Sequence, residues 1–291
     1  MSGKSDNRAV ARVTVVERFI EGKDPRSGLC EDAIHIDENF AAVIDGATTT
    51  RIVFEDGRTP GRVASEILIP ALGRLQPDLD ASAAIEALDT TIAEWYRSAG
   101  LYQAARLDVQ KRVTASAVIF SLARREIWMI GDCQALVDAE HLTNEKRTDS
   151  LTEEVRAYVI ESELAQGATV EDLIKDDTGR MVIDDLIRRQ RMFQNRGLGS
   201  PYDYFVLDGF LPSPPPVVVH RIPDDARTVV LASDGYPELH ASLQATESTL
   251  RDILHDDPLL YRRWKSTKGF YPGNRSFDDR AYVRMRLEPG Q

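Results

Sequence analysis

The chain is poor in cysteine, with only Cys30 and Cys133 among 291 residues. Two thiols are too few for the disulfide framework of a small secreted domain, and this scarcity fits a reducing compartment. The sequence also lacks any apolar run near the ~20 residues that span a bilayer. Residues 1–12 are polar and contain no apolar signal core. We therefore expect a cytoplasmic protein without a membrane partner.

Positive charge is also in short supply. Lys and Arg number 36 against 47 Asp and Glu, which gives a net charge of −11 and a pI near 5.0. Because phosphate backbones are bound by concentrated Lys and Arg, this balance argues against a nucleic-acid partner. The five histidines show no paired spacing, so the sequence does not indicate a zinc site.

Linkers and repeats are missing as well. No Pro/Gly/Ser-rich segment divides the chain, and no repeat period or low-complexity tract is visible. A hydrophobic content of 42% and a charged content of 29% are typical of a globular protein. We expect one domain over residues 8–291.

What the sequence does contain is a series of carboxylates at the ends of short apolar runs. Such runs, bounded by turn residues, predict buried strands. Asp45, Asp132 and Asp234 each follow one of these runs, and Asp278 with Asp279 precedes the last one. A carboxylate on a constrained turn at a strand end can be directed at a point shared with others. Hard divalent cations prefer such oxygen ligands.

The hydrophobic periodicity predicts strands, then two helices, then strands, a polar helical stretch, strands, helices and a final strand. This order indicates an α+β protein rather than regular βαβ units. The predicted strands are 13–19, 33–36, 40–44, 113–122, 126–130, 134–137, 204–207, 217–222, 227–232 and 281–287. The predicted helices are 61–75, 81–97, a stretch from 150 that continues over 170–194, and 245–265.

Six short blocks occur in a recognisable order: ED at 31–32, VIDG at 43–46, TASAV at 114–118, IGDC at 130–133, LASDG at 231–235 and DD at 278–279. This order resembles the metal-dependent protein phosphatases of the 2C type, the PPM family, over about residues 30–287. Each block alone is weak evidence, because SDG or DG occurs in many turns. The resemblance implies a four-layer α-β-β-α sandwich, in which two antiparallel sheets are flanked by helices and the carboxylates lie at one edge. It also implies a variable helical segment, the flap, at about 145–200 beside the active site.

The resemblance also implies roles for individual residues. Asp45 corresponds to the acid that bridges two ions, with the Gly46 carbonyl beside it. Glu31 then corresponds to a ligand of one ion, and Asp234 and Asp278 to ligands of the other. Asp32 would orient bound water. In addition, Asp132 with Asp234 resembles the site of a third ion in many bacterial members.

The implied cofactors are two Mn²⁺ or Mg²⁺ ions, with the third as an addition. The implied reaction is hydrolysis of phosphate monoesters, with phosphoserine and phosphothreonine proteins as substrates. The attacking group would be a water that bridges the two ions, since two such ions can lower its pKa and stabilise an in-line displacement. We expect a monomeric signalling enzyme that acts beside a cognate Ser/Thr kinase.

Three departures from the family pattern stand out. The phosphate-binding Arg before the ED pair is matched only by Arg26, one position off, which reads equally well as a solvated loop residue. No His follows Asp45-Gly46, where eukaryotic members carry His-Gly-Gly. The final block reads Asp278-Asp279 instead of DN, so that Asp279 is an alternative to Asp278, although the alignment of the following strand favours Asp278.

Two rival hypotheses follow from the sequence. A haloacid-dehalogenase-type phosphatase needs a second Asp two residues after its nucleophile, and position 47 is Ala, so we set this class aside. The alternative function is a phosphatase-like module with weak or no turnover that binds a phosphoprotein in a regulatory role. The departures favour this alternative, and the retained acids argue against it. The sequence alone does not distinguish Mn²⁺ from Mg²⁺ or identify the substrate.

Overall fold

Two five-stranded antiparallel sheets form the centre of the protein. We analysed a computed structural model, which describes residues 13–27, 29–47 and 53–288. One sheet has the strand order β1-β10-β9-β6-β7 and the other the order β2-β3-β4-β5-β8. Every pairing between these strands is antiparallel.

The strands are β1 (Val13–Glu21), β2 (Ala33–Ile36), β3 (Phe40–Gly46), β4 (Ala115–Ser121), β5 (Glu126–Ile130), β6 (Gln134–Val137), β7 (Glu140–Leu142), β8 (Val218–Arg221), β9 (Thr228–Ala232) and β10 (Arg280–Leu287). The helices are α1 (Pro60–Leu72), α2 (Ala81–Ser98), α3 (Tyr102–Leu107), α4 (Arg147–Ala165), α5 (Val170–Lys175), α6 (Thr178–Gln190) and α7 (Leu243–Asp256), and there are two 3₁₀ turns, Val109–Lys111 and Arg191–Phe193.

Strand β3 shows how the sequence builds the layers. Phe40, Ala42 and Ile44 pack in one hydrophobic cluster with α1 and α2, whereas Ala41 and Val43 pack in a second cluster shared by the two sheets. This alternation follows from the two-residue period of a strand. A third cluster joins the outer face of the other sheet to α7. The layers are therefore helix, sheet, sheet and helix, which confirms the predicted α-β-β-α sandwich.

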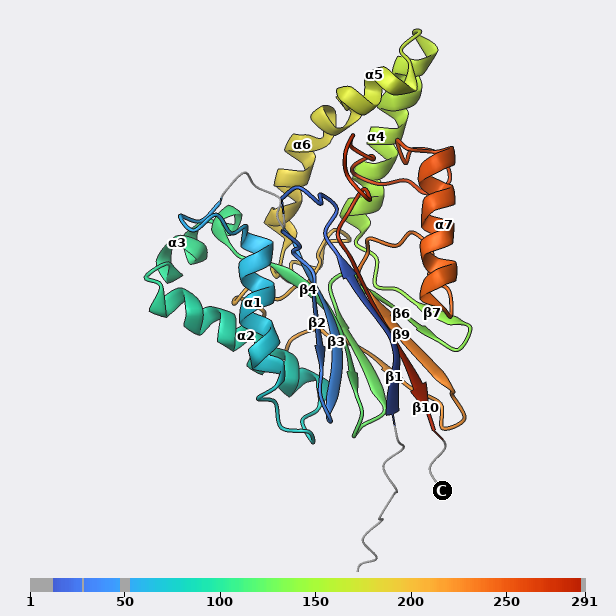
Figure 1. Cartoon of the computed structure of the whole chain (residues 1–291). Helices are drawn as coiled ribbons and strands as arrows, with labels where there is room; N and C mark the ends of the chain where they lie inside the picture. The colour runs from blue at the N-terminus through green and yellow to red at the C-terminus, as the bar shows by residue number, and fades with distance from the viewer. Residues whose placement is uncertain (1–12, 28, 48–52, 289–291) are drawn as a thin grey trace, which may run out of the picture.

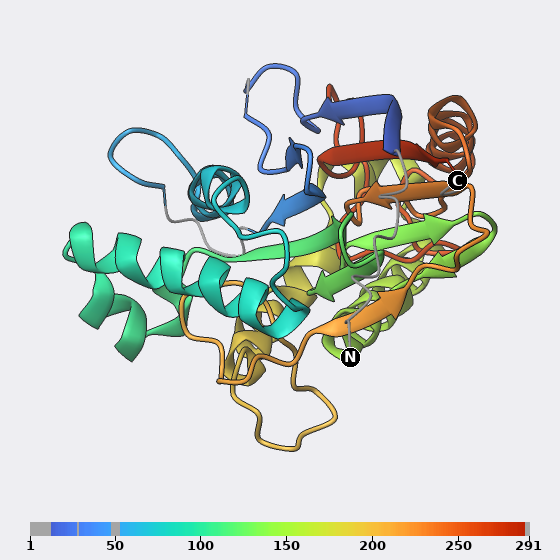
Figure 2. The ribbon, with the colours of Figure 1, turned by 90° about the horizontal axis from the view of Figure 1, so that it is seen from below.

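The helices lie on opposite sides of the paired sheets. Figures 1 and 2 show α1, α2 and α3 on one side and α7 on the other. The pair α4 and α6, with α5 between them in sequence, extends beyond one end of the strands (Figure 1). These three helices fall in the segment that the sequence marked as a flap. No helix in the described ranges is long and apolar enough to cross a bilayer.

Two predicted elements differ from the structure, each for a local reason. The expected strand 204–207 forms only isolated bridges, because the Asn195 side chain bonds both the N–H and the C=O of Val206, at 3.0 and 2.8 Å, in place of a neighbouring strand. The expected helix 245–265 ends at Asp256. The Asp257 carboxylate then accepts the backbone N–H groups of Tyr261 and Arg262, which holds the following residues in a loop.

Candidate metal centre

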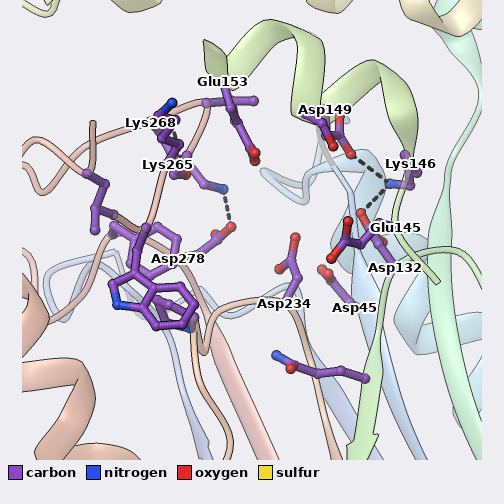
Figure 3. A pocket seen from close by; sticks show the side chains of 18 of the residues that line it. Asp45, Asp132, Glu145, Lys146, Asp149, Glu153, Asp234, Lys265, Lys268 and Asp278 are labelled. Atoms are coloured by element: carbon purple, nitrogen blue, oxygen red, sulfur yellow. Dashed lines mark hydrogen bonds and ion pairs between the residues drawn. The ribbon is translucent and has the colours of Figure 1, made fainter. Parts of the chain in front are cut away.

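Three carboxylates from both sheets converge on one point. Asp45 lies near the end of β3, Asp132 follows β5 and Asp234 follows β9, and an oxygen of each lies within 4.8 Å of one from each of the others. Figure 3 shows the three side chains directed toward one another at the floor of a pocket. The pocket is a cavity of about 940 Å³ that α4 and the loop after α7 also line.

Close backbone contacts at two glycines make this convergence possible. Gly131 has φ +81°, and a Cβ there would lie 2.1 Å from the Ser116 hydroxyl. A side chain at 131 would therefore push Asp132 away from Ser116, whose Oγ donates to Asp132 Oδ1 at 2.5 Å. At Gly46 a Cβ would lie 2.3 Å from the carbonyl oxygen of Gly61, so this position brings the start of α1 against the end of β3.

Asp45 and Asp234 are the carboxylates without a neutralising partner. In the described part of the chain, neither side chain makes a hydrogen bond or ion pair. Burial, and after it the charge of Asp234, raises the pKa of Asp45 well above its usual range. Burial and the charges of Asp132 and Asp278 raise the pKa of Asp234 to about 7. The Asp234 side chain is open to water inside the cavity, although it is surrounded by protein. A divalent cation bound to these two carboxylates would offset their mutual repulsion.

Asp132 has the opposite character. Burial works against its ionisation, but the Lys146 ammonium, 2.5 Å from Oδ2, and the Ser116 hydroxyl outweigh burial and lower its pKa. Both of its oxygens are therefore engaged, in contrast to those of Asp45 and Asp234.

The two acids of the last block have different environments. Asp279 is buried, and its carboxylate accepts the backbone N–H groups of Lys23 and Glu31, each at 2.8 Å. Both acids line the cavity, but Asp278 lies there between two ammonium groups, with Lys23 Nζ at 2.9 Å and Lys268 Nζ also in contact. These lysines outweigh burial and lower its pKa. Asp278 is thus placed to meet a ligand, and Asp279 braces the backbone around it.

The two acids of the ED pair also have different environments. Glu31 lines the cavity, and the Thr59 hydroxyl that caps α1 donates to its carboxylate. Asp32 is only 1% exposed and accepts the Ser233 hydroxyl at 2.6 Å. Burial raises the pKa of Asp32 well above its usual range, and the Ser233 bond only partly offsets this. Asp32 lies outside the cavity lining and holds Ser233, the neighbour of Asp234.

Arg26, the candidate phosphate binder, lies away from the cavity. Its side chain is 65% exposed, and its guanidinium contacts Asp24 at 2.8 Å and Asn274 at 3.3 Å. It is absent from the cavity lining, which contains Lys23 and Lys268. The solvated-loop interpretation of Arg26 fits this placement.

The first turns of α4 add residues that the sequence reasoning missed. Lys146, Asp149 and Glu153 line the cavity beside the three converging carboxylates (Figure 3). Burial, followed by the charges of Asp149 and Asp234, raises the pKa of Glu153 to about 8. Asp149 and Glu153 are four residues apart in α4 and therefore lie on one helix face, whereas Glu145 precedes the helix. That pattern alone is also typical of a solvated face.

No family model matches the chain, and no curated protein matches it. Solved structures that align with most of this chain include those of bacterial serine/threonine phosphatases. That of Mycobacterium tuberculosis PstP/Ppp is 17% identical, with a TM-score of 0.47 over 96% of this chain and 99% of that one. The catalytic domain of PstP with two manganese ions gives the same values. Stp1 from Staphylococcus aureus is 13% identical, with a TM-score of 0.48 over 99% and 100% of the two chains.

Proposed function

We propose that this protein is a metal-dependent phosphatase that hydrolyses phosphate monoesters, with phosphoserine or phosphothreonine proteins as its substrates. The observation that carries the proposal is the Asp45–Asp234 pair. Two carboxylates without a described hydrogen-bond or ion-pair partner approach each other at the floor of an open cavity, and burial together with the charge of neighbouring carboxylates raises the pKa of both. Such a pair fits a hard cation better than any role in packing.

Under this proposal, each metal ligand comes from a residue at the cavity. Glu31, Asp45 and the Gly46 carbonyl would hold one Mn²⁺ or Mg²⁺ ion, and Asp45, Asp234 and Asp278 the other. When bound, such ions activate water as a nucleophile and offset the negative charge that builds up on a phosphoryl group. Asp32 has a positioning role, because it holds Ser233 and through it the turn that carries Asp234.

The positive charge for the substrate phosphate would come from lysines. Lys23 and Lys268 lie on the cavity wall at Asp278, where the sequence pattern had suggested Arg26. Both ammonium groups are strong donors for phosphate oxygens. Because Lys23 is far from Lys268 in sequence, this pair exists only in the folded protein.

Glu153 would supply a proton to the leaving alkoxide. In the metal-free protein its pKa of about 8 favours the protonated carboxyl group at neutral pH, and its side chain points into the cavity above Asp234 (Figure 3). When the bond between phosphorus and the serine oxygen breaks, that oxygen leaves as a basic alkoxide, which needs such a proton. Cations near Asp234 would remove part of the repulsion and lower this pKa, so we expect the acid to be most useful at or below neutral pH.

The first experiment measures phosphate release from p-nitrophenyl phosphate and from a phosphothreonine peptide with added Mn²⁺. We expect Asp45→Asn to lower kcat/KM by at least ~100-fold, since even residues that only support a metal ligand are worth 10- to 100-fold. The matched control is Asp224→Asn, an exposed acid outside the cavity with one weak contact to Arg125 at 3.9 Å. Equal loss in both variants would contradict a role for Asp45 in the reaction.

One observation favours the alternative of a phosphoprotein-binding module with little turnover. Lysines already neutralise two of the carboxylates, Asp132 and Asp278, and Arg26 is engaged outside the cavity. A non-hydrolysing domain of this kind would bind Mn²⁺ and a phosphopeptide but release no phosphate. Calorimetry of Mn²⁺ and peptide binding, combined with the release assay, separates the two functions. A protein that binds neither would refute both.

A further inference from the structure

A lysine side chain of the protein itself occupies part of the acidic centre. Lys146 precedes α4 and extends to Asp132, with Nζ 2.5 Å from Oδ2. Its side chain is only 12% exposed, which is unusual for lysine. The ammonium also lies 3.7 Å from Asp149 Oδ2 and 5.5 Å from the centre of the Tyr204 ring. The ammonium group of Lys146 therefore contacts two carboxylates and one aromatic ring.

The contact with Lys146 gives Asp132 a different environment from those of Asp45 and Asp234. Its Oδ1 accepts from Ser116 and its Oδ2 pairs with Lys146, so each oxygen has a partner within 2.5 Å. Asp45 and Asp234 have no such partner in the described ranges. A divalent cation that bound Asp132 through Oδ2 would have to displace the ammonium or lie next to a like charge.

We propose that Lys146 is a tethered cation that takes the place of a metal ion at Asp132, and that it confines metal binding to the Asp45–Asp234 side of the cavity. The proposal rests on the metal site of the proposed function. It replaces the third ion suggested by the resemblance with a side chain. The protein would then need fewer ions for its full charge balance, and the ammonium would remain in place when the metal supply is low.

The test is a count of bound Mn²⁺ by electron paramagnetic resonance and calorimetry at pH 7.5. We expect two ions in the wild-type protein. In Lys146→Met, which keeps the length of the side chain and removes its charge, we expect one additional ion. Lys146→Arg retains the charge and should bind as many ions as the wild type. A matched control is Lys265→Met, because Lys265 lines the same cavity but pairs with Glu154, which is largely exposed.

A second substitution assigns the gained ion to Asp132. With Lys146 present, Asp132→Asn should leave the count at two. In the Lys146→Met background, the same change should abolish the additional ion. Far-UV circular dichroism and a melting curve with chelator establish that each variant is folded, and Lys146→Arg provides a reading should the Met variant unfold.

The outcomes separate this proposal from the proposed function. An unchanged count and affinity in Lys146→Met overturn the Lys146 proposal alone, as does loss of an ion from Asp132→Asn in the presence of Lys146. If Lys265→Met also bound one additional Mn²⁺ ion, the effect would come from the total charge of the cavity and not from Lys146. This result would also overturn the Lys146 proposal. A wild-type protein that binds no Mn²⁺ overturns both proposals.

Discussion

Replacing Asp45 by Asn should stabilise the metal-free protein, although it removes a proposed metal ligand. The oxygens of Asp45 and Asp234 lie within 4.8 Å of each other. At this separation, two ionised carboxylates repel by about 3 kcal/mol with an effective dielectric constant of 20. Asparagine has nearly the same shape and no charge. For a domain of this size we expect the melting temperature to rise by roughly 6 to 12 °C in EDTA at pH 8.5.

The pH dependence gives the prediction a second, independent check. The folded protein raises the pKa of Asp45 well above its usual range and that of Asp234 to about 7. Between about pH 4 and pH 7 the folded state therefore holds more protons at these groups than the unfolded chain. Stability from them is present at the acidic end and lost as the pH rises. The advantage of Asp45→Asn should thus be largest at pH 8.5 and small at pH 5.

Added Mn²⁺ should make the wild-type protein more stable than Asp45→Asn, the reverse of the order expected in EDTA. Mn²⁺ at 100 times its dissociation constant adds about 2.7 kcal/mol per site to the wild type, because the ions bind only the folded form. Asp45→Asn should lose most of this gain. The assay is urea unfolding at pH 5 and pH 8.5, with EDTA or Mn²⁺, and with Asp224→Asn as the control. A metal-free Asp45→Asn protein that is no more stable than the wild type at pH 8.5 would refute the argument.

Three further predictions concern the surroundings of the site. Asp279→Ala leaves two backbone N–H groups without their acceptor and should cost about 2 to 4 kcal/mol in urea unfolding; a loss of activity at full stability would instead make Asp279 a ligand. Gly131→Ala places a methyl group against Ser116 at a positive φ and should cost at least ~2 kcal/mol, whereas a neutral result would contradict the close contact. Glu153→Gln should lower kcat about 100-fold on a phosphoserine peptide but little on p-nitrophenyl phosphate, whose leaving group needs no proton, and it should remove the fall in activity above the pKa of Glu153. Equal effects on both substrates would exclude Glu153 as the acid.

Local patterns predicted the α+β order and most strand ends, whereas the four-layer sandwich was predicted from the resemblance of the six short blocks. Apolar runs that stop at an acid located β3, β5 and β9, and the structure brings their acids together. The choice between Asp278 and Asp279 depends on which carboxylate meets the N–H groups of Lys23 and Glu31, more than 240 residues earlier in the chain. No local pattern contains that information.

The same reason explains why the cations were missed. Lys146 and Lys268 belong to polar segments that read as solvated surface, and only the packing of α4 and of the loop after α7 turns them toward the cavity. Arg26 was a better match to the family pattern than either lysine. Its neighbour Asp24 offered a nearer partner, and the guanidinium lies there.

Asp45 lies near the end of a strand of one sheet, and Asp234 follows a strand of the other. A cation bound by both residues would link the two sheets, which no strand pairing joins in the described ranges. Removing the metal with a chelator should therefore weaken the packing of the two sheets against each other. We expect amide hydrogen exchange to become faster in β3 and β9 together. Neither sheet alone supplies both ligands, so the ion would bind only after the two sheets have packed together during folding.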